Sequence, residues 1–376
     1  NNRIIFTNEN LEPDLEELQV KTQEDMALTN RFSTMFLWSE KIFKREASDS
    51  VYYVNWNDAL TEAKCLFEIV TSGNANDLSR MQFGGIVKAA AIFLRDHSKE
   101  LKEDDWSWCI ELVIETVLAD ANANDTIAVE DSMDNDGAAA SASVLPILFD
   151  FADEDEDKFI IKSIIATALT HASENVRIST ANGIKKYLWQ ADPDFARSCF
   201  KASIEYARLK LEESKNAGFL KYSDDEEIAE ANLPESWLDH FREQIACGEV
   251  TTNIENISFN THSSWHILSS CLIIPDGSVE SAHIAFLSRM LNLILEAEET
   301  NKREYPEKKI RISDELPMNF AKKLAEHLLN LSEIDAQIFV EQLQNGCDAA
   351  PDFIHWLLLY LELFTEEMGK KELYWK

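Results

Sequence analysis

The sequence predicts an all-α protein, an α-solenoid of antiparallel helix pairs with little or no sheet. The main support lies between Gly137 and Leu211, where four consecutive segments have the length and apolar spacing of helices. Links of roughly two to six residues join them, and helices joined so closely lie antiparallel to their neighbours. Glycine and proline are also scarce, with ten and eight copies in 376 residues. That is too few for a sandwich or barrel with many tight turns.

Residues 1–130 are expected to form an N-terminal helical region. In the run FSTMFLWSEKIFK, the side chains of Phe32, Phe36 and Phe43 fall on one side of an amphipathic helix. The pair Asn57-Asp58 offers a cap for the next helix, DALTEAKCLFEIV. Two further helical segments follow, LSRMQFGGIVKAAAIFLRDH and EDDWSWCIELVIETVLAD. The second opens with acidic residues, which suit the positive end of a helix dipole.

Residues 131–213 are expected to hold the regular helix pairs, in GAAASASVLPILFDF, KFIIKSIIATALTHA, ENVRISTANGIKKYLW and DPDFARSCFKASIEYARLKL. Pro146 lies inside the first of these helices and should kink it or shift its start. In the third, Asn175-Val176-Arg177 is followed by Ala181 and Leu188. This spacing is typical of a HEAT-like repeat, in which a polar residue caps the helix and Val, Ala and Leu fill the seam between layers.

Residues 214–260 are expected to be an irregular insertion that contains one short helix, PESWLDHFREQIA, capped by Gly248. Residues 261–376 are expected to form a C-terminal helical region. Its helices are predicted in HSSWHILSSCLII, SAHIAFLSRMLNLILEAEE, LPMNFAKKLAEHLLNL, EIDAQIFVEQLQNG and PDFIHWLLLYLELFTEEM. Prolines stand where several helices should start, as proline prefers. These are Pro193, Pro234, Pro317 and Pro351.

The chain is strongly acidic, with 68 acidic against 35 basic residues and a net charge of −33. Most of such a surface repels a phosphate backbone, so we expect no direct binding of nucleic acid. Acidic residues gather between Asp120 and Asp157, where twelve occur without a single Lys or Arg. A solvated acidic surface is one interpretation of this pattern, and a basic protein partner is the other.

The six cysteines lack the CxxC spacing of zinc sites and redox motifs. Cys109, Cys199 and Cys271 fall on apolar helix faces, where a thiol acts as a small hydrophobic group. We therefore expect a reducing, cytoplasmic environment. No apolar run reaches the length of a membrane span, and no signal peptide is evident. Because the first residue is Asn and not Met, we expect the chain to be a piece of a longer one.

Motifs for phosphate and calcium binding are incomplete. The glycine pair Gly84-Gly85 lacks the spacing of a phosphate-binding loop and lies inside a helical pattern. The run SMDNDGAAASAS places Asp134, Asp136 and Gly137 at positions three, five and six of a calcium loop. Its first and twelfth positions are then Ser132 and Ser143, so the first and last ligands are missing. The sequence predicts neither site.

Metal-dependent and nucleophilic catalysis find no better support. His262 and His266 would share a helix face, with Cys271 near in sequence, but no third ligand has a characteristic spacing. No nucleophile motif appears either. We expect no catalytic residue, no cofactor and no metal, and a chain that is not an enzyme. An α-helical enzyme whose site has no sequence signature is a third alternative, which a deep polar pocket would support.

The last helix and the tail are rich in apolar and aromatic residues. In FIHWLLLYLELF, one stripe holds Trp356, Tyr360 and Leu363, so we expect a helix buried on two sides. The second stripe contains Ile354, Leu357, Leu358 and Leu361. Together with the acidic link after the first repeat helix, these aromatics are the candidate protein-binding residues. They are Asp153, Glu154, Asp155, Glu156, Asp157, Trp356, Tyr360, Tyr374 and Trp375.

About a fifth of the chain also resembles a known family. The stretch from DGAAASASVLPILFDF to DPDFARSCFKASIEYARL is similar to the C-terminal helical repeats of bacterial antiviral STAND ATPases. The resemblance is carried by Asp136-Gly137, Leu145-Pro146, Ala168 to His171, Glu174 to Arg177, Tyr187 to Trp189 and Asp192-Pro193.

The resemblance implies a sensor region that recognises a phage protein, such as a terminase or portal subunit. In that family the effector and the nucleotide-binding module lie elsewhere in a longer chain and drive oligomerisation. This sequence contains neither a phosphate-binding loop nor an effector motif, so no catalytic residue of the family can be transferred to it. The alternative is a scaffold or adaptor repeat protein that binds a host protein and has no immune role.

Overall fold

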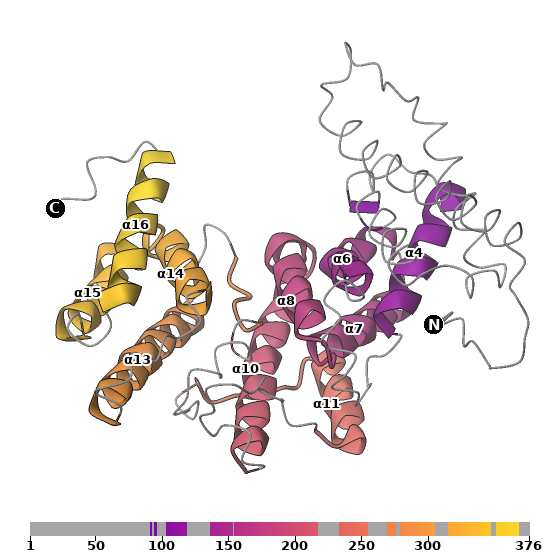
Figure 1. Cartoon of the computed structure of the whole chain (residues 1–376). Helices are drawn as coiled ribbons and strands as arrows, with labels where there is room; N and C mark the ends of the chain where they lie inside the picture. The colour runs from indigo at the N-terminus through magenta and orange to yellow at the C-terminus, as the bar shows by residue number, and fades with distance from the viewer. Residues whose placement is uncertain are drawn as a thin grey trace, which may run out of the picture. The chain divides into compact units, whose positions relative to one another are not determined.

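The structure is a computed structural model, and every regular element that it describes is a helix (Figure 1). The described residues are 91, 94–95, 103–118, 136–152, 154–216, 233–254, 268, 270–275, 279–304, 315–346 and 351–367. Within these ranges there is no strand, so the prediction of an all-α fold is confirmed. The chain divides into two compact units, residues 1–180 and 181–376, and each is described by itself.

Several predictions fall outside the described residues. They include the helices expected before residue 91 and the glycine pair Gly84-Gly85. The same holds for His262 and His266, and for Asp153, Tyr374 and Trp375 among the candidate binding residues. The structure does not test these predictions.

The first unit contains α4 (Glu103–Leu118), α6 (Asp136–Val144), the 3-10 helix η3 (Leu145–Phe151) and α7 (Asp155–Leu169). Helix α4 packs against α6, α7 and η3. The α-helical geometry ends at Val144, and Pro146 lies in the first turn of η3. Proline has no N–H to donate and its ring clashes with the preceding turn, so the predicted distortion at Pro146 is confirmed.

Helix α8 (Glu174–Gly183) follows α7 after a short link and contains the boundary between the units. Val176 is fully buried, as the repeat spacing predicts. Asn175, in contrast, is exposed in the first turn. The cap position belongs to Ser173, whose carbonyl oxygen accepts the first helical hydrogen bond, from the N–H of Arg177 at 3.3 Å.

The side chain of Arg177 closes the corner between α7 and α8. Its Nη1 donates to the carbonyl oxygens of His171 and Ala172, at 2.7 Å each. These carbonyls follow the end of α7, where helix termini leave acceptors unsatisfied and favour a positive charge. The buried guanidinium therefore fixes the turn between the two helices.

The third predicted helix continues beyond α8 in altered geometry. A π-helical turn, η4 (Ile184–Leu188), leads into the short α9 (Trp189–Ala191). Leu188 is fully buried, as is Ile184, so the predicted seam continues through η4. Asp192 then caps α10 (Pro193–Asn216), because its Oδ1 accepts the N–H of Phe195 at 3.0 Å. Proline occupies the first position of α10, as predicted.

Helix α11 (Glu235–Cys247) packs against α10. It ends at Gly248, whose φ of 75° is the left-handed conformation that glycine adopts most easily. The predicted glycine cap is therefore confirmed.

One predicted helix is only partly present. Within HSSWHILSSCLII, residues 270–271 form a turn and residues 272–275 have no regular structure, although Ile273 and Ile274 are fully buried. The expectation of a helix through Ile274 is wrong. Ile274 precedes Pro275, and a residue before proline is disfavoured from helical backbone angles.

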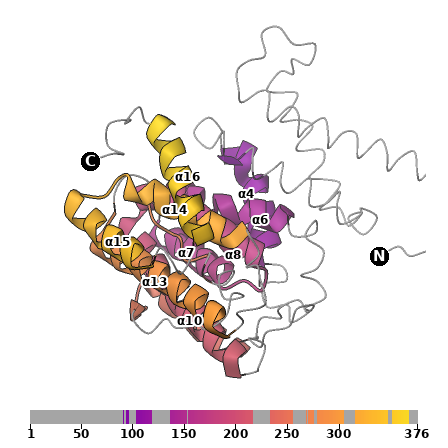
Figure 2. The same ribbon diagram turned by 60° about the vertical axis from the view of Figure 1, so that its left-hand side comes forward.

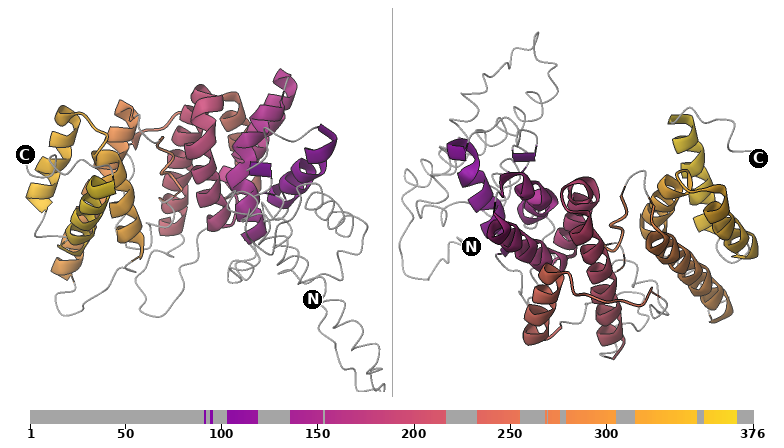
Figure 3. Two further views of the ribbon diagram at one scale, coloured as in Figure 1. Left: turned by 90° about the horizontal axis from the view of Figure 1, so that it is seen from above. Right: turned by 180° about the vertical axis from the view of Figure 1, so that it is seen from behind.

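The C-terminal part holds α13 (Ser281–Glu304), α14 (Glu315–Leu328), α15 (Glu333–Gly346) and α16 (Pro351–Glu367). Helix α14 packs closely against α16, and α13 packs against α15 (Figure 2). Figure 3 shows the same four helices as one group, coloured orange to yellow. Contact between helices two apart in sequence is typical of neighbouring repeats, and the solenoid arrangement itself stays a prediction.

Helix α16 is buried on one side only. Phe353 and Leu357 are buried, and the ring of Phe353 stacks on Phe320 of α14 at 6.0 Å. Leu358 and Leu363 lie on the outside and are exposed. The expectation of a helix buried on two sides is therefore wrong, because α14 is its principal packing partner among the described elements.

Candidate protein-binding surface

The acidic link predicted as a contact site forms the entry to α7. Glu154 holds the N-cap position, and Asp155, Glu156 and Asp157 make up the first turn. All four are exposed. The positive end of the helix dipole favours negative charge at this place, so the acids stabilise the helix start without needing a partner side chain.

Two large apolar side chains follow the acids directly. Phe159 is 47% exposed and Ile160 is 51% exposed, which is far more than the rest of the apolar residues of α7. Each lies one helical turn beyond an acid, Phe159 after Asp155 and Ile160 after Glu156, and residues four apart share a helix face. We call Glu154–Asp157 with Phe159 and Ile160 the acidic-apolar surface.

The opposite face of α7 anchors this surface. Ile161, Ile164 and Ile165 are buried, as are Ala168 and Leu169 toward the C-terminus. The helix also packs against α4 and η3. The exposed side chains therefore project from a helix that the core of the first unit holds in place.

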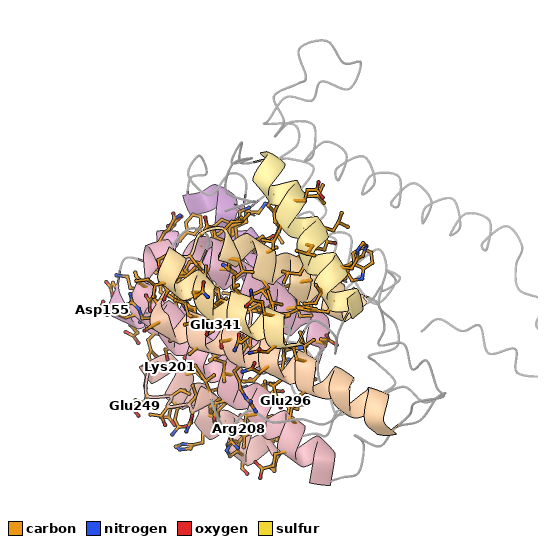
Figure 4. All side chains as sticks on the ribbon, turned by 90° about the vertical axis from the view of Figure 1, so that its left-hand side faces the viewer. Asp155, Lys201, Arg208, Glu249, Glu296 and Glu341 are labelled. Carbon is orange, nitrogen blue, oxygen red and sulfur yellow. The ribbon has the colours of Figure 1, made fainter. Side chains whose placement is uncertain are left out.

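The charge of the acidic-apolar surface is mostly unneutralised within its own helix. Lys158 Nζ lies 4.0 Å from Asp155 Oδ1, and both side chains are well exposed. An ion pair of this kind contributes about 0–1 kcal/mol and is screened by salt. The side chain of Asp155, labelled in Figure 4, is fully exposed to solvent.

The second unit presents an apolar surface of a different kind. Ile334 and Ile338 on α15 are exposed, and so are Leu358, Leu359 and Leu363 on α16. The predicted binding residues Trp356 and Tyr360 are half-buried. The ring of Trp356 lies 5.8 Å from that of His355, and the ring of Tyr360 stacks on Phe364 at 6.1 Å. The structure thus brings Trp356 and Tyr360 to the same helix as three exposed leucines.

A buried histidine in the second unit packs among aromatic rings as part of the core. His283 is 1% exposed, and its ring packs edge-on against Trp189 at 5.2 Å and Phe200 at 4.6 Å. Its Nδ1 accepts the backbone N–H of Glu280 at 3.1 Å. Burial lowers the pKa of His283 to about 4, against the raising effect of Glu280. The imidazole is therefore neutral at pH 7 and acts as a core side chain.

An ion pair lies beside this histidine. Arg197 Nη2 is 2.9 Å from Glu280 Oε1, and Arg197 Nη1 is 2.7 Å from Asp194 Oδ1. The hydrogen bond from Arg197 lowers the pKa of Glu280 below its usual range. The pair joins the start of α10 to the residue before α13.

The sequence did not single out the apolar half of the acidic-apolar surface. The run KFIIKSIIATAL contains more large apolar residues than one helix face can bury, and that excess is the signal for an exposed pair. From the sequence, Arg177 is predicted only as part of the repeat spacing. An arginine just inside a helix that follows a short link is a weak signal for the carbonyl contacts it makes.

Two kinds of feature are absent from the described residues, a cluster of metal-ligand side chains and a membrane-spanning helix. Within them, no three His, Cys, Asp or Glu side chains come together as metal ligands would. Among the same residues, no helix combines the length and apolar character needed to cross a membrane.

Comparison of the sequence with protein-family models and with curated proteins gives no match.

Proposed function

We propose that the chain is a protein-recognition module and that the acidic-apolar surface of α7 is its contact site. The observation that carries the proposal is the placing of Phe159 and Ile160, each half exposed, one turn beyond two exposed acids. Apolar side chains that become buried on binding supply most of the energy of protein interfaces, and the charges around them select the partner.

The partner that fits this surface is a basic protein segment with an apolar side chain at its centre. Lys or Arg residues would meet the acids from Asp155 to Asp157, while the apolar group would cover Phe159 and Ile160. Two such residues are too few for a stable hydrophobic interface alone, so the charges must contribute to affinity as well.

As the finer proposal, the module is the sensor region of an antiviral STAND ATPase, and its partner is a phage protein such as a terminase or portal subunit. The resemblance of residues 136–209 to helical repeats of that group supports it. A buried Val176 and Leu188 in the expected seam also agree with a repeat of that kind, although many helical-repeat proteins share this feature.

Binding to immobilised terminase, portal and capsid proteins tests the proposal. The full chain is compared with the variant Asp155→Lys/Glu156→Lys and with the variant Phe159→Ser/Ile160→Ser. We expect a specific binder among the phage proteins and at least about tenfold weaker binding by each variant, since tenfold corresponds to about 1.4 kcal/mol and an interface anchor or a reversed charge is worth about 2 kcal/mol or more.

Matched controls carry the same chemical changes elsewhere. Glu235→Lys/Asp239→Lys alters two exposed acids of α11, and Leu358→Ser/Leu363→Ser alters two exposed leucines of α16. If these controls weaken binding as much as the α7 variants do, the contact site lies elsewhere or the attraction is unspecific.

A scaffold or adaptor that binds a host protein is the second candidate function. This function would use the same acidic-apolar surface, and the two candidate functions differ only in the identity of the partner. Binding of a host protein that depends on Phe159 and Asp155, with no binding of any phage protein, would favour the adaptor.

A further inference from the structure

Two lysines of the second unit share one carboxylate oxygen. Lys185, on the π-helical turn η4, places Nζ 3.4 Å from Oε2 of Glu326 on α14. Lys323, one turn before Glu326 on the same helix, places Nζ 3.1 Å from that oxygen. The ammonium of Lys323 therefore competes with a second ammonium for its carboxylate.

The cluster lies partly out of water. The side chain of Lys185 is 9% exposed, while those of Lys323 and Glu326 are 28% and 25% exposed. The charges of neighbouring groups therefore act on Lys323 with reduced screening, while part of its side chain stays exposed to solvent.

The environment lowers the pKa of Lys323 and so raises the fraction of its amine that is neutral. Burial lowers its pKa from the ordinary lysine value, and the positive charge of Lys185 lowers it further. Glu326 acts in the opposite direction but does not restore the ordinary value. A lysine that is desolvated and lies beside another cation is the usual setting of a nucleophilic amine.

We propose that Lys323 is a modification site whose amine takes up acyl groups from small acyl phosphates. The lone pair of Nζ attacks the acyl carbon and forms the new N–C bond. The C–O bond to the phosphate breaks, and inorganic phosphate leaves with its electron pair. The proton lost from nitrogen passes to solvent water.

The fold should tolerate this modification. Acylation removes the charge of Lys323 and with it the ion pair between Lys323 and Glu326. Lys185 keeps its contact with Glu326, which holds η4 to α14. One lysine then faces one carboxylate, so the loss of a charge relieves repulsion in the cluster.

Acetylation of the full chain by acetyl phosphate at pH 7.5 tests the proposal, with rates at each lysine followed by mass spectrometry. Lys322 is the matched control, since it is the next residue of α14 and is exposed. We expect Lys323 to react at least about threefold faster than Lys322, because each unit of lowered pKa raises the neutral fraction about tenfold. Equal or slower reaction at Lys323 overturns the proposal.

Two variants separate the charge effect from simple access. Lys185→Met should lower the ratio of the Lys323 rate to the Lys322 rate, because it removes the repelling ammonium. Glu326→Gln should raise that ratio, because it removes the stabilising carboxylate. Local unfolding would expose Lys323 in both variants and move both ratios the same way, an outcome that also counts against the proposal. Lys201→Met on α10 changes an exposed lysine elsewhere and should leave the ratio as it is.

Discussion

Arg177 in the first unit and His283 in the second are equally buried, at 1% exposure each, yet they are accommodated in opposite ways. Arg177 keeps its charge and gives hydrogen bonds to two carbonyl oxygens after α7. His283 gives up its charge and packs between aromatic rings. A guanidinium cannot lose its proton in a protein, so it must be supplied with acceptors, whereas an imidazole can adapt to an apolar core.

The largest effect is expected from Arg177→Ala. The change removes the donor to the carbonyls of His171 and Ala172 and leaves a cavity, so the free energy of unfolding should fall by about 4 kcal/mol. Urea denaturation measures it. Arg208→Ala is the control, because the Arg208 side chain is 26% exposed and pairs with acids of its own helix. It should cost about 1 kcal/mol or less.

Leu188→Ala measures how much the loss of apolar packing alone lowers the free energy of unfolding. Leu188 is fully buried and has no polar group, so its truncation should lower the free energy of unfolding by about 3 kcal/mol. Leu363→Ala, at a position that is 45% exposed, should cost much less. If Arg177→Ala costs no more than Leu188→Ala, the hydrogen bonds of the guanidinium add nothing to its packing.

The pH dependence of stability isolates His283. Its pKa is about 4 in the folded chain and near 6.5 when unfolded, so the unfolded state binds more protons between these values. The contribution of His283 is complete above pH 6.5 and is lost as the pH falls toward 4. Between pH 7 and pH 5 the loss should be about 2 kcal/mol.

The variant His283→Phe should lack this component, and the difference between the variant and the original chain gives it directly. His240→Gln, at an exposed position on α11, should retain it. Equal slopes for the original chain and His283→Phe would show that the imidazole is not kept neutral by its surroundings. No such pH dependence should arise from Arg177, which stays charged throughout.

The smallest effect is expected from Asp155→Lys/Glu156→Lys. Both side chains are exposed, so losing their contacts with the helix dipole should lower the melting temperature by no more than the equivalent of about 1 kcal/mol. Thermal melting by circular dichroism measures it. A larger loss would mean that the first turn of α7 depends on its acids for stability, and weakened binding by this variant would then need another explanation.

Periodicity was enough to predict the seam of Val176, Ala181 and Leu188, because burial of one helix face repeats every three to four residues whatever lies opposite. It was not enough to predict which polar residue is buried at the turn between α7 and α8, Asn175 or Arg177. Both are polar. The outcome depends on where the carbonyls at the end of α7 point, and no local sequence pattern contains that information.

The sequence predicted the acidic half of the candidate site but not its apolar half. A run of acids after a helix shows itself in composition, so Glu154–Asp157 was found. The exposure of Phe159 and Ile160 depends on which face of α7 meets α4 and η3, and that is a property of packing. The same limit explains α16, whose two apolar stripes look alike in sequence: of their residues Leu357 is buried, whereas Leu358 and Leu363 are exposed.

The order of side chains along α7 has a kinetic consequence for any partner that binds there. The acids act at a distance of about 8 Å at physiological ionic strength, so they govern how fast the partner arrives. Phe159 and Ile160 act only in contact, so they govern how long it stays. Salt should then slow capture with little effect on residence time, and truncating the apolar pair should shorten residence with little effect on capture.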